Sequence, residues 1–236
     1  MDGRLISIEG IDGSGKTSLV ESVKNITNLR FVNRKSKICN KLNKNIVYTK
    51  EPTDYDTGIT VKRFLNSDIN PLSLTFLFMA DHSEHISRLI RPSLEQGKIV
   101  IVDRYIDSRY AYQGVTLKKY FSITNQRFVS YESEIRNDPI KWLKKIHSPF
   151  SITPNYTILL VVDIDIAMER IRQREQRLIL FEKREFLEEV QKNYLKLAEE
   201  EPGRFIKIDA NENIEQVERK LVKELSRIFD SWTKNL

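Results

Sequence analysis

One short segment near the N-terminus constrains the fold more than any other feature. Residues 10–17 read G-I-D-G-S-G-K-T and fit the pattern G-x-x-x-x-G-K-[ST]. The glycines allow positive φ and let successive backbone N–H groups face one anion. An alternating run at 4–9 precedes the segment, and apolar residues at helical spacing follow it within 16–28. A strand, this loop and a helix in that order predict a phosphate-binding loop at a helix N-terminus.

The rest of the chain repeats a strand followed by a helix about five times. Continuous apolar runs such as 99–102 and 158–162 are typical of strands buried on both faces of a parallel sheet. This order predicts an α/β fold, an open parallel five-stranded sheet flanked by helices, with ligands at the carboxyl ends of the strands. The expected strands are 4–9, 46–49, 99–102, 158–162 and 205–208. The expected helices are 16–28, 58–66, 71 to about 97, 165–175, 183–200 and 214–230.

Length and composition favour one domain over residues 1–236. There is no internal repeat or low-complexity linker, and we treat about 30–45 and 115–153 as insertions, the second with short helices. The single cysteine, Cys39, excludes an intrachain disulfide. No apolar run approaches the roughly 18 residues of a membrane span, and the first residues do not resemble a signal peptide. We therefore expect a cytoplasmic protein with no membrane partner.

The charge is moderately basic. There are 39 Lys and Arg against 33 Asp and Glu, a net charge of +6 with a pI of about 9.2. Part of the excess lies in a basic run at 30–44 that contains no acid. Because charge runs usually face water, we favour a solvated insertion, with binding of a polyanion as the alternative. A second cluster comprises Arg170, Arg172, Arg174 and Arg177.

The phosphate-binding loop indicates a nucleoside triphosphate with Mg²⁺ but not the reaction. Lys16 is expected to reach the β- and γ-phosphates, and the Thr17 hydroxyl to ligate Mg²⁺. A small-molecule kinase, a GTPase-type switch and a motor or ATPase module all remain open. The absence of an obvious N-K-x-D motif argues against the switch. The expected ATP-binding residues are Gly10, Ile11, Asp12, Gly13, Ser14, Gly15, Lys16, Thr17 and Ser18.

A second group of polar residues follows the buried run at 99–102. Asp103 can hold the Mg²⁺ shell or orient an attacking oxygen, and Arg104 offers a planar fork for a phosphate. A purely structural ion pair is the alternative. The segment T-K-E-P at 49–52 ends the preceding expected strand, and a polar and aromatic run extends to Gly114. Kinases of small phosphorylated acceptors need such a second anion pocket facing the phosphate-binding loop.

These segments together resemble the thymidylate kinase family, which phosphorylates dTMP with ATP. The matching pieces are G-I-D-G-S-G-K-T, T-K-E-P, L-F-M-A-D-H-S-E-H, D-R-Y-I-D-S-R-Y-A-Y-Q-G and F-E-K-R-E-F-L. The resemblance runs from residue 4 to about 230, except for the two insertions. The A-D-x-x-E-H version of the middle motif resembles the archaeal branch.

The resemblance implies roles for residues at matching positions. Asp12 is implied to bond the 3′-hydroxyl of the acceptor, Arg104 to grip its phosphate, and Asp103 to order magnesium and water. Phe78 is implied to stack on thymine and Tyr112 to favour deoxyribose, although either ring alone is equally readable as packing. Ser108 and Arg109 match positions that meet the base edge, and Glu51 one near the acceptor phosphate and metal. The implied substrate-binding set is Asp12, Lys50, Glu51, Phe78, His82, Arg104, Ser108, Arg109, Tyr112 and Gln113.

The arginine cluster acquires a role from the same resemblance. Phosphoryl transfer needs positive charge over the γ-phosphate. Some members of the family place that arginine in the phosphate-binding loop, and others have glycine there and arginines in a mobile lid. With Gly13 in the loop, this sequence resembles the lid type, with a lid at about 170–182. The implied catalytic residues are Lys16, Asp103, Arg104, Arg172, Arg174 and Arg177, and the family implies a homodimer packed through helices around 71–97 and after Asp103.

Three positions depart from the family pattern. His82 stands where arginine usually contacts the base, Arg109 where a small polar residue or amide is common, and Lys50 where T-R-E-P has arginine. We hypothesise that Arg109 supplies the donor that His82 gives up. His82 and His85 lie three residues apart and invite a metal interpretation, but a third ligand is not evident, so we favour a polar helix contact.

The sequence therefore favours a dTMP kinase with ATP as donor and Mg²⁺ as cofactor. A broader pyrimidine monophosphate kinase is the first alternative, motivated by His82 and Arg109. A deoxynucleoside kinase is weaker, because the phosphate-gripping residues argue against it. An ATP-dependent protein that binds nucleic acid through residues 30–44 is the alternative from another class, and we regard it as unlikely.

Overall fold

The computed structural model describes residues 3–33, 46–123, 135–173 and 183–233. Its centre is a five-stranded parallel sheet in the order β2-β3-β1-β4-β5. The strands are β1 (Arg4–Gly10), β2 (Ile46–Lys50), β3 (Ile99–Asp103), β4 (Tyr156–Val161) and β5 (Phe205–Asp209). The expected α/β fold with five parallel strands is confirmed, and each expected strand lies within two residues of the observed one at either end.

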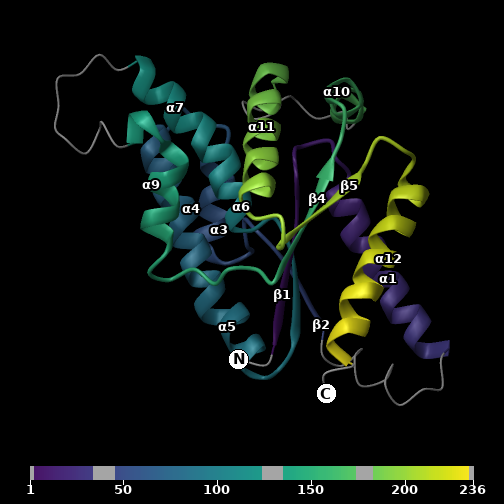
Figure 1. The fold of residues 1–236 in the computed structure, drawn as a ribbon. Helices are drawn as coiled ribbons and strands as arrows, with labels where there is room; N and C mark the ends of the chain where they lie inside the picture. Colours follow the sequence, from purple (N-terminus) through teal and green to yellow (C-terminus); the bar gives the residue numbers. More distant parts are fainter. Residues whose placement is uncertain (1–2, 34–45, 124–134, 174–182, 234–236) are drawn as a thin grey trace.

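Helices cover both faces of this sheet (Figure 1). α1 and α12 pack together on one side, while α4, α7, α9 and α11 lie on the other. The helices are α1 (Lys16–Asn33), α3 (Asp56–Phe64), α4 (Pro71–His85), η1 (Ile86–Ile90), α5 (Arg91–Glu95), α6 (Ile106–Ser108), η2 (Arg109–Gln113), α7 (Gly114–Ile123), α9 (Pro139–His147), α10 (Ile164–Arg172), α11 (Arg184–Glu200) and α12 (Ile214–Thr233).

The core is formed by the apolar strands and the helix faces that cover them. All five residues of β3 are buried, as are six of the seven in β1. A strand covered on both faces has no solvated side to carry polar residues, which is why these runs read as continuous apolar stretches. Helix α12 shows the opposite pattern, with Val217, Leu221, Leu225 and Ile228 buried on one face at helical spacing.

The helical stretch expected from residue 71 to about 97 is interrupted by a wider turn. α4 continues into the π-helical segment η1 and then into α5, which begins at Arg91 and carries Pro92. Proline lacks an N–H and its ring clashes with the carbonyl four residues earlier in a regular helix. The wider turn before Pro92, with the Arg91 N–H donating to the Ile86 carbonyl, accommodates that clash.

One segment is more helical than the sequence suggested, and a second forms the short helices that were expected. The polar and aromatic run after β3 forms α6 and η2, in which all eight residues from Ile106 to Gln113 are buried. Part of the 115–153 stretch forms α7 and α9, which pack on each other and on η2. Residues 124–134 of that insertion, Cys39 and most of the basic run at 30–44 lie outside the described residues.

The parallel arrangement brings the ends of β1 and β3 together. Ile8 of β1 lies opposite Asp103 of β3, and the Arg104 N–H donates to the Ile8 carbonyl at 3.0 Å. β1 also pairs with β4 on its other side. β3 and β2 therefore extend the sheet on one side of β1, and β4 and β5 extend it on the other. This switch point is where open α/β sheets bind their ligands.

No helix in the described part of the chain is long and apolar enough to cross a membrane.

Candidate active site

The loop between β1 and α1 has the backbone that a phosphate site requires. Gly10, Gly13 and Gly15 all have positive φ, at 147°, 81° and 87°. A Cβ added at Gly13 would lie 2.4 Å from the backbone carbonyl oxygen of Ala167 in α10. No larger residue fits there without moving α10, so this position cannot carry the arginine that other members of the resembled family have in the loop.

Lys16 begins α1 and folds back over this loop. Its Nζ donates to the Ile11 carbonyl at 2.7 Å and to the Ser14 hydroxyl at 3.1 Å, and the residue is 5% exposed. Burial, followed by the nearby Arg104 guanidinium, lowers the pKa of Lys16 to about 7. A bound triphosphate would reverse this effect, because negative charge favours the protonated amine.

Thr17 and Asp103 meet where a magnesium ion is expected. The Thr17 hydroxyl donates to Asp103 Oδ2 at 2.9 Å, while Oδ1 of the same carboxylate is buried and accepts no hydrogen bond. A buried carboxylate oxygen without a partner fits a hard cation, which prefers oxygen ligands. Among the described residues no cluster of three His, Cys, Asp or Glu side chains forms a complete metal site. The Thr17 hydroxyl and the free Asp103 oxygen suit an ion that is held jointly with phosphate oxygens and water.

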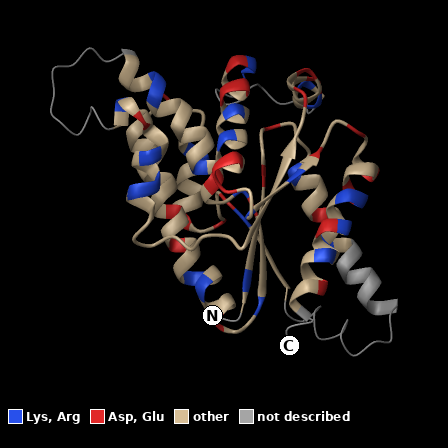
Figure 2. Ribbon diagram, in the orientation of Figure 1, with Lys and Arg blue, Asp and Glu red and all other residues tan. Residues whose placement is uncertain are grey.

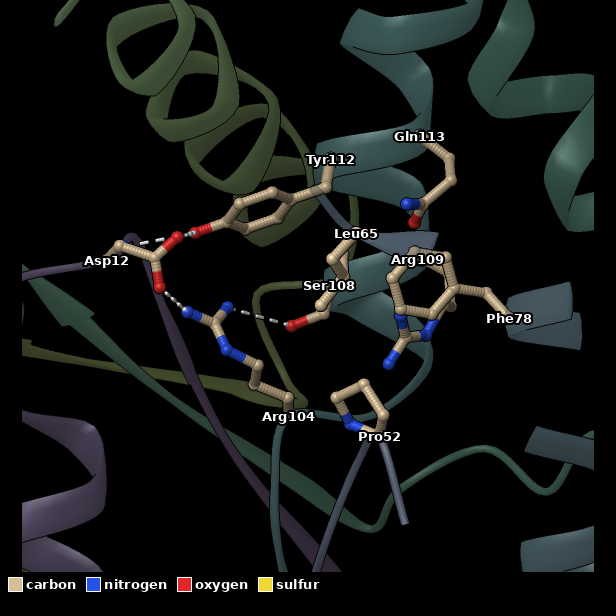
Figure 3. A pocket seen from close by; sticks show the side chains of 9 residues that line it. All are labelled: Asp12, Pro52, Leu65, Phe78, Arg104, Ser108, Arg109, Tyr112 and Gln113. Atoms are coloured by element: carbon tan, nitrogen blue, oxygen red, sulfur yellow. Dashed lines mark hydrogen bonds and ion pairs between the residues drawn. The ribbon is translucent and has the colours of Figure 1, made fainter. Parts of the chain in front are cut away.

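Arg104 and Asp12 form the second half of the site, facing the loop. Arg104 has a positive φ of 62°, and its Nη1 donates to the Gly10 carbonyl at 3.2 Å. Its Nη2 forms an ion pair with the Asp12 carboxylate. The Tyr112 hydroxyl donates to Asp12 Oδ2 and accepts from the Asp12 N–H, both at 3.0 Å. The three side chains thus form one network in the lining of a pocket (Figure 3).

This pocket has a polar side and an apolar side. In Figure 3, Asp12 and Arg104 lie across the pocket from Phe78, Arg109 and Pro52, with Tyr112 and Gln113 above. Gln113 Oε1 is buried without a hydrogen-bond partner. The lining residues are Asp12, Pro52, Leu65, Phe78, Arg104, Ser108, Arg109, Tyr112 and Gln113. The arrangement offers cations for a phosphate beside apolar and polar groups for a planar base.

Beneath the pocket lies a buried carboxylate that the sequence did not single out. Glu9 of β1 accepts from the Tyr105 N–H at 2.8 Å, the Ser108 hydroxyl at 2.6 Å and the Tyr194 hydroxyl at 3.0 Å. Burial, with Asp107 adding to it, raises the pKa of Glu9 to about 7. Ser108, expected at the base edge, thus lines the pocket while its hydroxyl bonds Glu9. The only signal for Glu9 was an acid inside an apolar strand.

Three expected substrate ligands lie apart from the pocket. His82 is fully buried, with Nδ1 bonded to Glu51 at 2.9 Å and Nε2 to Ser151 at 3.0 Å, so it does not take the base-contacting place. Glu51 itself is enclosed by His82, His85 and Arg109. The Lys50 side chain is exposed and lies 3.7 Å from the Asp54 carboxylate. The expected polar role of His85 agrees with its bond to Glu51, also at 2.9 Å.

The arginine cluster divides between the described and undescribed residues. Arg170 donates to the backbone carbonyls of Gly13, Ala210 and Glu212 at 3.5, 3.0 and 3.0 Å. It lines a second pocket against the phosphate loop, with Gly15, Ser18 and Leu19. Arg172 is exposed at the end of α10. Arg174 and Arg177, with most of the expected lid, lie outside the described residues.

Fold and site together define a P-loop nucleotide kinase, with a triphosphate loop facing an acceptor pocket across the switch point. A family model described as thymidylate kinase matches residues 8–130 and 128–221. The chain belongs to the thymidylate kinase family. It is 41% identical to a probable thymidylate kinase of Methanococcoides burtonii over 231 residues, 98% of this chain and all of that one. The probable thymidylate kinase of Methanosarcina mazei is 39% identical over 95% of this chain and 96% of its own.

A solved structure gives the same result for the fold. The crystal structure of thymidylate kinase from Ehrlichia chaffeensis matches with a TM-score of 0.64 at 26% identity. The match covers 95% of this chain and 98% of that one. The resemblance read from the sequence, including its archaeal character, is confirmed by these relatives.

Proposed function

We propose that this protein transfers the γ-phosphoryl group of ATP to dTMP, giving dTDP and ADP. The observation that carries this proposal is the shared position of Asp12. Asp12 lies inside the phosphate-binding loop, and its carboxylate reaches across to Arg104 and Tyr112 in the acceptor pocket. One segment therefore positions both the donor phosphates and the acceptor, which is the arrangement that transfer between two bound nucleotides needs.

On the donor side, the loop N–H groups and Lys16 would hold the β- and γ-phosphates. Their negative charge would keep the Lys16 amine protonated despite its burial. Thr17 and Asp103 would hold Mg²⁺, since the Thr17 hydroxyl contacts Asp103 Oδ2 and the buried Oδ1 has no hydrogen-bond partner. When bound, Mg²⁺ would neutralise charge on the β- and γ-phosphate oxygens. Positioning and charge then supply most of the catalysis.

On the acceptor side, Arg104 would bind the phosphate of dTMP and align its attacking oxygen. Its guanidinium is held by the Gly10 carbonyl and Asp12, so the fork is in place before the substrate arrives. Asp12 would accept from the 3′-hydroxyl, and the Tyr112 ring would close the space beside the sugar. Gln113 Oε1, buried and unpaired, would meet the edge of the base.

Further properties expected from the sequence belong to this proposal as well. Residues 1–236 would form one kinase domain whose lid, about 170–182, carries Arg172, Arg174 and Arg177 toward the γ-phosphate. The enzyme would act as a homodimer in the cytoplasm. Acidic and basic residues are interspersed along α11 and α12 in Figure 2, with ion pairs such as Lys192–Glu189. This mixed surface favours nucleotides over nucleic acid as the partner within the described part of the chain.

The test is ADP release with ATP and Mg²⁺ over a panel of dTMP, dUMP, UMP, dCMP and thymidine. We expect rapid release with dTMP, slow release with UMP and none above background with thymidine, which lacks the phosphate that Arg104 binds. Arg104→Met should abolish the reaction with dTMP. Equal rates with thymidine and dTMP would contradict the acceptor-phosphate site.

A further inference from the structure

One buried carboxyl joins three segments behind the acceptor pocket. Glu9 of β1 is fully buried, and its Oε1 accepts from the Tyr105 N–H at 2.8 Å. Its Oε2 contacts the Ser108 hydroxyl of α6 at 2.6 Å and the Tyr194 hydroxyl of α11 at 3.0 Å. The two hydroxyl oxygens also contact each other, at 2.8 Å. Glu9 Oε2 and these two hydroxyl oxygens therefore form a closed oxygen triangle.

The oxygen triangle has more contacts than the two hydroxyl groups have hydrogen atoms. An ionised Glu9 only accepts hydrogen bonds, so both hydroxyls donate to it and none is left for the contact between Ser108 and Tyr194. In a protonated triangle, Glu9 donates to Ser108, Ser108 donates to Tyr194, and Tyr194 donates to Glu9. Each contact then contains one hydrogen. Because all three residues are at most 2% exposed, an unfilled contact is costly, and the geometry favours the protonated carboxyl.

The charges around Glu9 act in both directions, and burial decides between them. Burial raises the pKa of Glu9 to about 7, and the Asp107 carboxylate of α6 adds to this effect. Asp107 is itself paired with Arg204, which lies before β5, at 2.6 Å. Arg104 after β3 and Lys16 on α1 favour the ionised form of Glu9. The pKa and the hydrogen count thus agree on a carboxyl that carries a proton below pH 7.

Glu9 also fixes the position of Arg104. Arg104 has a φ of 62°, a left-handed conformation that a residue with a side chain adopts only at a cost. Its own N–H donates to the Ile8 carbonyl at 3.0 Å, and the next N–H, that of Tyr105, donates to Glu9. The Arg104 Nη1 lies 3.5 Å from the Ser108 hydroxyl, as the dashed line in Figure 3 shows. Glu9 therefore supports Arg104 through the backbone and through Ser108.

We propose that Glu9 holds a proton in the free protein and keeps it while the phosphate of the acceptor is bound at Arg104. An ionised Glu9 competes with that phosphate for the positive charge of the guanidinium, and it opens the oxygen triangle. Glu9 is thus a positioning residue that acts through Arg104 and does not touch the substrate. This inference rests on the proposed function, because it takes the acceptor phosphate to bind at Arg104.

The expected pH dependence has a definite sign. A bound phosphate adds negative charge near Glu9 and raises its pKa above the value of about 7 in the free protein. Below pH 7, Glu9 is already protonated, so acceptor binding takes up little at this residue. Above pH 7, binding requires the uptake of a proton, and the affinity for the acceptor falls as the pH rises. A rise of one pKa unit on binding corresponds to a loss of affinity of about tenfold.

The experiment measures KM for dTMP at saturating ATP and Mg²⁺ between pH 6.5 and pH 9, in the unmodified protein and in Glu9→Gln. We expect KM to rise about tenfold more in the unmodified protein, with little change in kcat. Glutamine fills the oxygen triangle with its amide hydrogens and does not ionise. The comparison cancels the titration of the substrate phosphate and of Lys16, which are the same in both proteins. Glu199→Gln removes an exposed carboxylate on α11 and should keep the rise.

Proton uptake tests the same inference without catalysis. Calorimetry of dTMP binding at pH 8, in two buffers of different ionisation enthalpy and without ATP, counts the protons taken up. The unmodified protein should take up about half a proton more than Glu9→Gln. Thymidine, which has no phosphate, should produce no such difference between the two proteins.

A third variant separates positioning from folding. Glu9→Ala leaves the Tyr105 N–H without its acceptor and should raise KM for dTMP at every pH, whereas Glu9→Gln should restore a low KM. A parallel rise of KM with pH in the unmodified protein and in Glu9→Gln, with equal proton uptake, would overturn the inference. Failure of the unmodified protein to phosphorylate dTMP, although it binds dTMP with the expected proton uptake, would refute the proposed function instead.

Discussion

The buried carboxyl of Glu9 should make the stability of this protein depend on pH in a way that one substitution removes. Glu9 is fully buried beneath the acceptor pocket, and burial raises its pKa from 4.5 to about 7. Folding therefore favours the protonated form. The stability that this group contributes is fully present below pH 4.5 and is lost as the pH rises through 7. At 1.36 kcal/mol for each pKa unit, the loss is about 3 kcal/mol across that window.

Glu9→Gln keeps the shape of the side chain and removes the titration. The glutamine oxygen can accept from the Tyr105 N–H, and its amide can donate to the Ser108 and Tyr194 hydroxyls. The variant should match the unmodified protein near pH 5 and exceed its free energy of unfolding by about 2–3 kcal/mol at pH 8. Urea denaturation at both pH values measures this difference without adding salt.

The control is Glu199→Gln, which neutralises an exposed carboxylate on α11. It should leave the pH dependence of stability as it is in the unmodified protein, because an exposed group gains little from folding. If Glu9→Gln loses stability in parallel with the unmodified protein from pH 5 to pH 8, Glu9 does not titrate in that range. The burial argument for this site would then be refuted.

Three further outcomes follow from the site geometry. Gly13→Ala should lower Tm by several degrees more than Gly97→Ala, because both glycines have positive φ but only Gly13 lies against Ala167. Equal decreases in Tm for the two variants in thermal melts would contradict this. Binding of a non-hydrolysable ATP analogue should take up nearly one proton at pH 8 and little at pH 6, because Lys16 has a pKa of about 7 before the phosphates bind. Calorimetry in two buffers measures the proton uptake, and equal uptake at both pH values would contradict this assignment to Lys16. Tyr112→Phe should lower kcat/KM for dTMP about tenfold, because the hydroxyl that holds Asp12 is lost. The preference for dTMP over UMP should remain, because the ring is kept. Steady-state kinetics with both nucleotides measure this preference, and its loss would show that the hydroxyl and not the ring determines it.

The parts of the fold that the sequence predicted well are those with strong local signals. β3 and β4 are buried on both faces, so their apolar runs are unbroken and end where polar residues begin. The phosphate-binding loop is readable because its glycines meet a backbone requirement within a few residues. Asp103 follows from the same logic, since the end of a buried parallel strand opens at the ligand edge of the sheet.

The segment from Ile106 to Gln113 shows what local signals miss. All eight residues are buried, so polar, charged and aromatic side chains follow one another without a solvated face. Amphipathic periodicity marks a helix only when one face meets water. The wider turn of η2 changes the rotation of successive side chains further. Nothing in the residue order reveals that turn, which depends on packing against α9, α7 and α11.

The sequence predicted which residues gather around the base pocket but not which of them line it. Both His82 and Arg109 were expected near the base, and the difference between them lies in the rotation of their helices. α4 directs His82 toward Glu51 and Tyr105, while η2 brings Arg109 to the pocket wall. Side chains on separate helices compete for such a site, and only the packing of those helices decides which one lines it.

Arg170 also changes the interpretation of the arginine cluster. Its guanidinium donates to three backbone carbonyls, of which Gly13 belongs to the phosphate-binding loop and Ala210 and Glu212 follow β5. A cation bound in this way positions its helix rather than a substrate. Gly13 meanwhile packs against Ala167 of the same helix, so α10 is attached to the loop at two points. The arginines proposed to reach the γ-phosphate begin at Arg172, after this attachment. Their distance from the phosphates is therefore set at one end by the same loop that binds the phosphates.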